Sequence, residues 1–161
     1  MFPRFEGLRL VINVKGRLLG VDYGQARIGL AISDHTGLIA SPIDAVNAEG
    51  TADADTVACI AIKNEAVAIV VGLPLSLDGS YGPAARKVNA FCRQLRLSTD
   101  LPVYVWDERM TTIEAQSILR ESGNKPTWAR GKARGRIDSA SAAIILNAYL
   151  QSNHYSNGTN E

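Results

Sequence analysis

Residues 17–33 read RLLGVDYGQARIGLAIS, two apolar runs joined by a turn that contains Gly24. The first run ends at Asp22, and Gly29 breaks the alternation of the second. Two short apolar runs around a glycine-bearing turn predict a β-hairpin. A further extended stretch at residues 37–46 follows a polar turn, so we expect the chain to begin with a three-strand antiparallel meander.

After the meander, helical and extended patterns alternate. VAIVVG at residues 67–72 is uniformly apolar and β-branched, as expected for a central strand covered on both faces. The other predicted elements are helices at residues 54–64 and from 84 to about 95, a strand at 102–106, a helix from a capping box at Thr111 to Ser122, and a final helix at 137–151. This order predicts an α/β fold with a mixed five-stranded sheet, the meander plus parallel strands, and helices on both faces.

The composition fits one globular domain. With 161 residues, of which 46% are apolar and 20% charged, the chain can bury one core and carries too little charge for a disordered protein. We assign the domain to residues 18–151, an N-terminal extension to residues 1–17 and a flexible tail to residues 152–161. The formal net charge is +1, so any basic binding site must be local.

Cysteine usage and hydropathy exclude several classes of protein. Cys59 and Cys92 lie 33 residues apart with no CxxC motif, which excludes a disulfide scaffold and a cysteine zinc site, and we expect both to be reduced packing thiols. The N-terminus lacks the pattern of a signal peptide, and no segment approaches the roughly 20 apolar residues of a membrane span. A cytoplasmic location is expected.

Three carboxylates occupy places where chemistry is possible. Asp22, near a strand end, either caps the turn or projects toward a ligand or metal. Glu108 follows the strand at 102–106 and either forms a surface ion pair with Arg109 or belongs to a site. Asp138 lies in the first turn of the last helix, where an acidic residue also stabilises the helix dipole.

The three carboxylates together are stronger evidence for a functional site than each one alone. Residues at strand ends and at the start of a helix can lie close together when these elements pack on one sheet. Clustered carboxylates are tolerated mainly when a divalent cation neutralises them. Oxygen ligands suit Mg²⁺ or Mn²⁺, which activate water and stabilise a leaving oxygen in phosphodiester cleavage. The pattern therefore predicts a metal-dependent nuclease.

A basic segment precedes Asp138. Its four cations alternate with small residues and are Arg130, Lys132, Arg134 and Arg136. Such a segment is either a solvated loop or, beside a carboxylate, a binding site for the phosphate backbone, and we favour phosphate binding. If it does not bind, the basic surface is expected among Arg86, Lys87 and Arg93.

Four segments resemble one known family. GVDYGQARIGLAISDHTGLIASP, VVGLPLSLDGSYGPAARKVNAFCRQL, PVYVWDERMTT and IDSASAAIILNAYL are similar, in order and spacing, to the YqgF (RuvX) family of RNase H-like proteins over residues 18–150. The resemblance implies an RNase H-like fold. It also implies that Asp22, Glu108 and Asp138 are the catalytic, metal-binding residues. We expect Arg109, beside Glu108, to contact the nucleic acid together with the basic segment.

The resemblance leaves the second ligand open. Many RNase H-like nucleases carry an acidic residue on the central strand, where this chain has Val71-Gly72. Asp107 and Asp78 are therefore alternatives to Glu108.

Members of the family are regarded as homologues of Holliday-junction resolvases and as nucleases that mature the 5′ end of the 16S rRNA precursor. The resemblance thus implies a Mg²⁺- or Mn²⁺-dependent endonuclease in rRNA processing and ribosome biogenesis. Its expected partners are precursor rRNA or branched DNA, and pre-ribosomal particles, with the protein a monomer or a homodimer. The alternatives are a resolvase-like DNase, a non-catalytic nucleic-acid-binding module, and a nucleotide-binding protein, although actin-like ATPases need two such domains.

Overall fold

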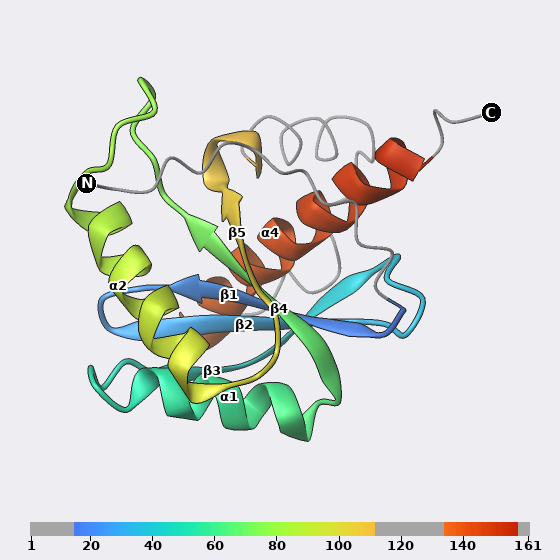
Figure 1. Cartoon of the computed structure of the whole chain (residues 1–161), viewed down its shortest axis with the longest axis horizontal. Helices are drawn as coiled ribbons and strands as arrows, with labels where there is room; N and C mark the ends of the chain where they lie inside the picture. Colours follow the sequence, from blue (N-terminus) through green and yellow to red (C-terminus); the bar gives the residue numbers. More distant parts are fainter. Residues whose placement is uncertain (1–14, 112–133, 158–161) are drawn as a thin grey trace.

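The computed structural model describes residues 15–111 and 134–157, with the backbone alone for 134–138 and 154–157 (Figure 1). The elements, in chain order, are β1 (Arg17–Tyr23), β2 (Arg27–Ser33), β3 (Ala40–Asn47), α1 (Asp53–Lys63), β4 (Ala66–Leu73), α2 (Pro83–Ser98), β5 (Val103–Asp107) and α4 (Arg134–Asn157). Residues 108–111 continue from β5 directly into a helical turn. The predicted hairpin and meander are confirmed as β1, β2 and β3.

The strands form one mixed sheet of five in the order β3-β2-β1-β4-β5. β1 pairs antiparallel with β2, and β2 with β3, whereas β4 runs parallel to both β1 and β5. The predicted five-stranded mixed sheet is confirmed. β1 is its middle strand, and β4, which we expected to be central, lies beside it between β1 and β5.

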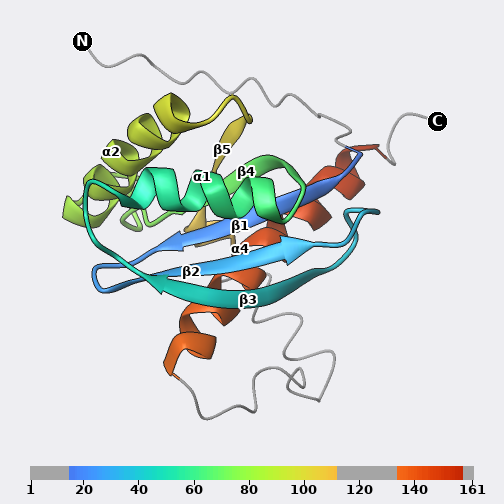
Figure 2. The same ribbon diagram turned by 90° about the horizontal axis from the view of Figure 1, so that it is seen from below.

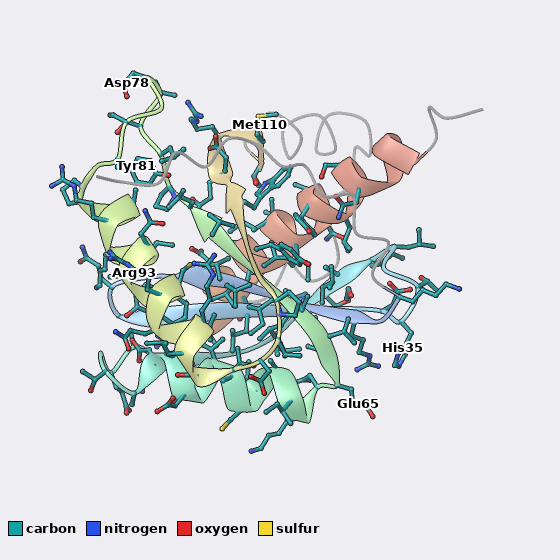
Figure 3. The ribbon with its side chains drawn as sticks, in the orientation of Figure 1. His35, Glu65, Asp78, Tyr81, Arg93 and Met110 are labelled. Atoms are coloured by element: carbon teal, nitrogen blue, oxygen red, sulfur yellow. The ribbon has the colours of Figure 1, made fainter. Side chains whose placement is uncertain are left out.

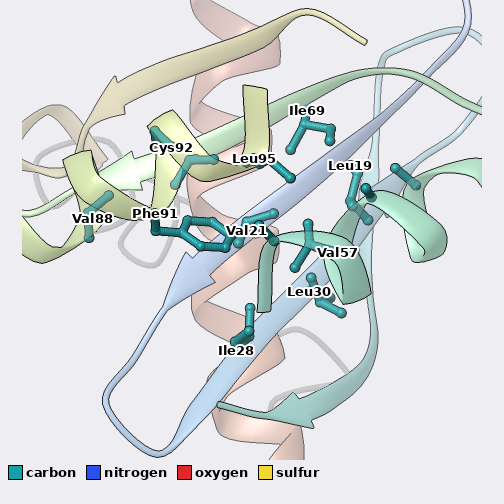
Figure 4. Close-up of a cluster of buried hydrophobic side chains, with 14 of the residues drawn as sticks. Leu19, Val21, Ile28, Leu30, Val57, Ile69, Val88, Phe91, Cys92 and Leu95 are labelled. Carbon is teal, nitrogen blue, oxygen red and sulfur yellow. The ribbon is translucent and has the colours of Figure 1, made fainter. Parts of the chain in front are cut away.

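Helices cover both faces of the sheet, as Figure 2 shows. The larger core cluster lies under α1 and α2, where Leu19 and Val21 of β1 pack with Phe91 and Leu95 (Figure 4). The smaller cluster lies under α4 and includes Leu18. Because side chains alternate along a strand, the even-numbered positions of β1, Asp22 among them, belong to the α4 face.

α4 packs unusually close to the middle strand. A Cβ atom at Gly20 would lie 2.8 Å from the Leu146 Cβ and 3.0 Å from the Ala142 carbonyl oxygen. Two polar side chains also join the helix to the meander. Ser139 Oγ lies 3.5 Å from the Leu30 N–H, and the Asn147 amide bonds both the N–H and the carbonyl of Ala40. These contacts fix the position of α4 over the sheet.

The predicted boundaries of two helices were wrong. The helical turn after β5 begins at Glu108, not at Thr111, because the Asp107 carboxylate accepts the backbone N–H of Arg109, as an N-cap side chain does. The Thr111 hydroxyl instead accepts the Trp106 Nε1–H at 2.8 Å. The continuation of that helix to Ser122 lies outside the described residues. α4 extends beyond the predicted 137–151 at both ends, so residues 152–157, which we assigned to a tail, are helical. The next glycine after this segment is at 158, and no proline intervenes.

Three smaller expectations are resolved as well. Arg17, which we placed in the N-terminal extension, is the first residue of β1, while residues 1–14 lie outside the described part. Cys92 packs in the core as expected, but Cys59 is exposed on α1. Among the helices described, none is both long and apolar enough to cross a bilayer.

Candidate active site

The candidate site lies where β1, β4 and β5 end. The three strands are parallel neighbours, so their carboxyl ends meet at one edge of the sheet. Val21 pairs with Val71, and Gly72 pairs with Trp106. Asp22 therefore follows directly on one side of Gly72, and Glu108 comes two residues after its partner on the other side.

Gly72 provides the space in which Glu108 lies. A Cβ atom there would be 2.6 Å from Glu108 Oε1 and 2.7 Å from Ile145 Cδ1 of α4. The Glu108 carboxylate thus leans over β4, at the position where an acidic residue of the central strand was expected and where the chain has glycine. A glycine in an otherwise β-branched strand often marks such a close approach, and this is the signal that our sequence analysis did not use.

Asp22 and Glu108 influence one another electrostatically. Burial, together with the negative charges of Asp22 and Asp107, raises the pKa of Glu108 to about 7. Two carboxylates in one half-buried place repel each other, and a divalent cation relieves that repulsion. Carboxylate oxygens are the ligands that Mg²⁺ and Mn²⁺ prefer, so the chemistry of this pair fits such a cation.

Asp107 forms an ion pair with Arg109. Arg109 Nε lies 3.0 Å from both of its carboxylate oxygens, Arg109 Nη2 lies 2.6 Å from Oδ2, and the Arg109 backbone N–H donates to Oδ1. The Arg109 guanidinium lowers the pKa of Asp107. The ion pair considered between Glu108 and Arg109 is thus made by Asp107 instead.

Asp78, the other alternative, lies in the loop between β4 and α2 (Figure 3). Its carboxylate is exposed and accepts the backbone N–H of Ser80 at 2.9 Å. Hydrogen bonding to the Ser80 side chain and, after it, to this backbone N–H lowers the pKa of Asp78, which is typical of a carboxylate that caps its own turn. Asp78 is therefore explained by the loop conformation.

Asp138 lies in the first two turns of α4, and its side chain is outside the described part. Its neighbour Ser139 is buried, with the hydroxyl near the N–H of Leu30. Leu30 follows Gly29, which pairs with Asp22 in the β1–β2 ladder. Across the described side chains, no group of three or more His, Cys, Asp or Glu residues could hold a metal ion. Asp22 and Glu108 interact electrostatically.

The basic segment is only partly described. Arg130 and Lys132 lie outside the described residues, whereas Arg134 and Arg136 belong to the first turn of α4. The expectation of a loop reaching Arg136 is therefore wrong for its last residues. Gly135 does not prevent the helix, since glycine in a helix costs only about 1 kcal/mol relative to alanine.

Comparison with known proteins gives consistent results. The family model described as "RuvX: Holliday junction resolvase" matches residues 16–152. A relative from Anaeromyxobacter sp. (strain Fw109-5), named "Putative pre-16S rRNA nuclease", is 42% identical over 139 residues, which cover 86% of this chain and 98% of the relative. A relative of the same name from Halothermothrix orenii is 41% identical over 135 residues, covering 83% and 94%.

Solved structures show the same fold at low identity. Thermus thermophilus RuvC in complex with a Holliday junction substrate has a TM-score of 0.54 and 15% identity, covering 89% of this chain and 97% of that one. The large terminase nuclease of the thermophilic phage G20c has a TM-score of 0.52 and 15% identity, covering 84% and 82%. The fold is therefore the RNase H-like fold of resolvases.

Proposed function

Since the chain belongs to the RuvX family, we propose that it is a nuclease that depends on a divalent metal ion and holds that ion with Asp22, Glu108 and Asp138. One observation carries the proposal: Glu108 leans over Gly72 beside Asp22 and has a pKa raised to about 7. Carboxylates that repel one another at the open edge of a sheet are a cost to folding that a bound cation removes.

The protein supplies the position of the ligands. β1 and β5 are held in register on either side of β4, so that Asp22 and Glu108 approach the same place from two strands. A bound Mg²⁺ or Mn²⁺ would supply charge stabilisation for the phosphate and activation of water. Asp22 and Glu108 would hold it through their negative charges and orient it.

Asp138 is proposed as the third carboxylate on the basis of its position along α4. Position 138 is seven residues before Ile145, which packs at Gly72, and seven residues make about two turns of a helix. It also directly precedes Ser139, which is anchored at Leu30 near Asp22 in the sheet. Both placements bring the start of α4 to the edge where Asp22 and Glu108 meet.

For the substrate, we propose the precursor of 16S rRNA, cleaved during maturation of its 5′ end. The support is the shared name of the curated relatives, which this chain matches over nearly their whole length. A cytoplasmic location and contact with pre-ribosomal particles are part of this proposal. The second candidate is a four-way DNA junction, favoured by the description of the matching family model, and cutting it symmetrically would require a homodimer.

A cleavage panel tests the proposed function. The purified protein is incubated with labelled pre-16S rRNA and, separately, with a four-way junction, in Mg²⁺, in Mn²⁺ and in chelator. We expect metal-dependent cleavage of the RNA, and Asp22→Asn should abolish it while affinity for RNA is retained, since the amide keeps the shape and loses the charge. Asp44→Asn, which changes an exposed aspartate of β3, is the matched control and should cleave normally.

Each other outcome identifies an alternative. Cleavage of the junction alone would make the protein a resolvase-like DNase. Binding of RNA without cleavage under every metal condition would contradict the nuclease proposal and favour a binding module. Full activity of Asp22→Asn would remove Asp22 from the catalytic set.

A further inference from the structure

Arg109 lies between the acidic edge and the loop at residues 74–82, which connects β4 with α2. Towards the edge, its guanidinium forms an ion pair with Asp107 at 2.6 Å. Towards the loop, its Nη1 lies 3.4 Å from the carbonyl oxygen of Leu77. All three guanidinium nitrogens therefore face a protein acceptor, although about a third of the side chain is exposed.

The loop is shaped around this guanidinium. Gly79 has φ +83°, a conformation that side-chain-bearing residues rarely adopt, and a Cβ atom there would lie 3.3 Å from Arg109 Nη1. Backbone hydrogen bonds from Gly79 to Ser76 and from Ser76 to Ser80 close the turn. The glycine thus allows the turn and the guanidinium to approach closely.

The loop is anchored at its start by Leu75, which packs against the larger core cluster, but its tip needs a further anchor. Its tip carries Leu77, whose side chain is 96% exposed and contributes almost nothing to packing. The hydrogen bonds within the turn join loop residues to one another. Among the described residues, Arg109 makes the hydrogen bond that reaches the tip from another element. Figure 3 shows this loop and Met110, which follows Arg109, at the same end of the molecule.

We propose that Arg109 is a positioning residue for the active site: it neutralises Asp107 and holds the loop at residues 74–82 in place beside Asp22 and Glu108. This inference rests on the proposed nuclease function. It differs from the role predicted from the sequence alone, in which Arg109 contacts the nucleic acid. The two roles lead to opposite results for binding and for catalysis.

A direct phosphate contact has a known signature. Each such contact lowers the binding constant by about 0.7 to 0.9 log units per log unit of salt, so losing it flattens the salt dependence by about that amount. Lysine supports a phosphate contact as a point charge, but it cannot replace a planar fork that spans Asp107 and Leu77. A positioning role predicts an unchanged salt slope and a lower kcat, since misplacement by about 1 Å can cost up to about 100-fold in rate.

The test compares three variants with the full-length wild type in Mg²⁺. Arg109→Gln removes the charge, Arg109→Lys keeps it without the fork, and Gly79→Ala disturbs the same contact without altering any charge. We expect each to lower kcat at least about tenfold, with a KM within about threefold of wild type and a salt slope within about 0.3 of wild type. Lys63→Gln, an exposed charge at the end of α1, is the control and should behave as wild type.

Hydrogen exchange of the loop amides gives a readout that is independent of activity. If Arg109 holds the loop, the amides of residues 76–80 should exchange at least about tenfold faster in Arg109→Gln and Arg109→Lys, while β1 and β4 stay protected. Thermal unfolding shows whether Gly79→Ala is folded, and the two Arg109 variants decide the question if it is not.

Two results would overturn the proposal. One is a salt slope that flattens in Arg109→Gln while Arg109→Lys and Gly79→Ala keep full activity, which is the signature of a phosphate contact. The other is unchanged exchange of the loop amides in both Arg109 variants. If the wild type cleaves no substrate at all, the proposed function fails, and the exchange measurement alone still decides whether Arg109 holds the loop.

Discussion

At the scale of single residues, the site depends on Glu108 being a carboxylate that is costly to ionise. Its pKa is raised to about 7, so in the metal-free protein the neutral form is favoured by folding. The raised pKa therefore stabilises the folded protein in full at pH values below the ordinary pKa of glutamate. This stabilisation is lost as the pH rises through about 7. A cation reverses the preference, because it binds the ionised form.

We therefore predict that the metal-free protein loses stability between pH 5 and pH 8. The loss in free energy of unfolding should be at most about 3 kcal/mol, because one pKa unit corresponds to about 1.36 kcal/mol and the side chain keeps some contact with solvent. Urea unfolding in chelator, measured at several pH values, checks this. Glu108→Gln should show a flatter pH dependence, and identical curves for the two proteins would contradict the assignment.

A second prediction at this scale concerns Gly72. In Gly72→Ala the added methyl group would collide with the Glu108 carboxylate and with Ile145 Cδ1, and overpacking of this kind costs about 1 to 3 kcal/mol. The Glu108 carboxylate must then leave its present position over Gly72, so cleavage should fall as well.

A double-mutant cycle isolates this contact. Because Glu108→Ala vacates the space, adding Gly72→Ala to it should cost less stability than adding it to the wild type, by about 1 kcal/mol or more. Denaturant unfolding of the four proteins gives the coupling. Strict additivity would show that Gly72 does not make room for Glu108.

At the scale of elements, the sequence allowed the strands to be predicted better than the contacts between them. The apolar runs at residues 17–33 and 67–72 predicted β1, β2 and β4, because alternation and β-branching are local properties. The role of Gly72 could not be predicted in the same way, since it exists only when β5 and α4 pack against β4. The pairing of Arg109 with Asp107, in place of Glu108, likewise depends on how the helical turn leaves β5.

Helix ends were the weakest part of the prediction. Thr111 has the spacing of a capping box, yet its hydroxyl accepts the Trp106 indole N–H. The helical turn starts earlier because Asp107 accepts the backbone N–H of Arg109, as an N-cap side chain does. α4 continues on both sides of the predicted range because no breaker stops it and its packing on β1, β2 and β3 favours helix. The result matters for function, since it places Arg134 and Arg136 on α4.

The prediction at the scale of elements concerns RNA binding by the basic segment. Replacing Arg130, Lys132, Arg134 and Arg136 by Ala should weaken binding to different RNA sequences alike and flatten the salt slope by up to about 3 to 4 units. The thermal midpoint should change little, because alanine is the best helix former. Binding at several salt concentrations, with denaturation curves alongside, measures both.

A matched variant separates the two candidate basic surfaces. Arg86, Lys87 and Arg93 are exposed on α2, a helix without acidic residues, and can be replaced together by Gln. If the quadruple variant keeps the wild-type salt slope of RNA binding and this triple variant has a flatter one, the phosphate-binding surface lies on α2. Our assignment of phosphate binding to the basic segment would then be wrong.

At the scale of the whole molecule, the proposed metal site joins residues that are 86 and 30 positions apart in the chain, from Asp22 to Glu108 and from Glu108 to Asp138. They can meet only in the folded protein, so metal affinity reports on the complete fold and not on a local motif. With a net charge of +1, the chain has no global attraction for a cation or for RNA, and binding must come from these local groups.

The most direct test of the central claim is a titration with Mn²⁺, followed by water-proton relaxation, of the wild type and of Asp22→Asn, Glu108→Gln, Asp138→Asn and the control Asp44→Asn. We predict that the wild type and Asp44→Asn bind Mn²⁺ alike, and that each of the other three variants loses at least about tenfold in affinity while remaining folded. The loss follows from removing one negatively charged ligand from a three-carboxylate site. Wild-type affinity in Asp22→Asn or Glu108→Gln would contradict a shared metal site at this edge of the sheet.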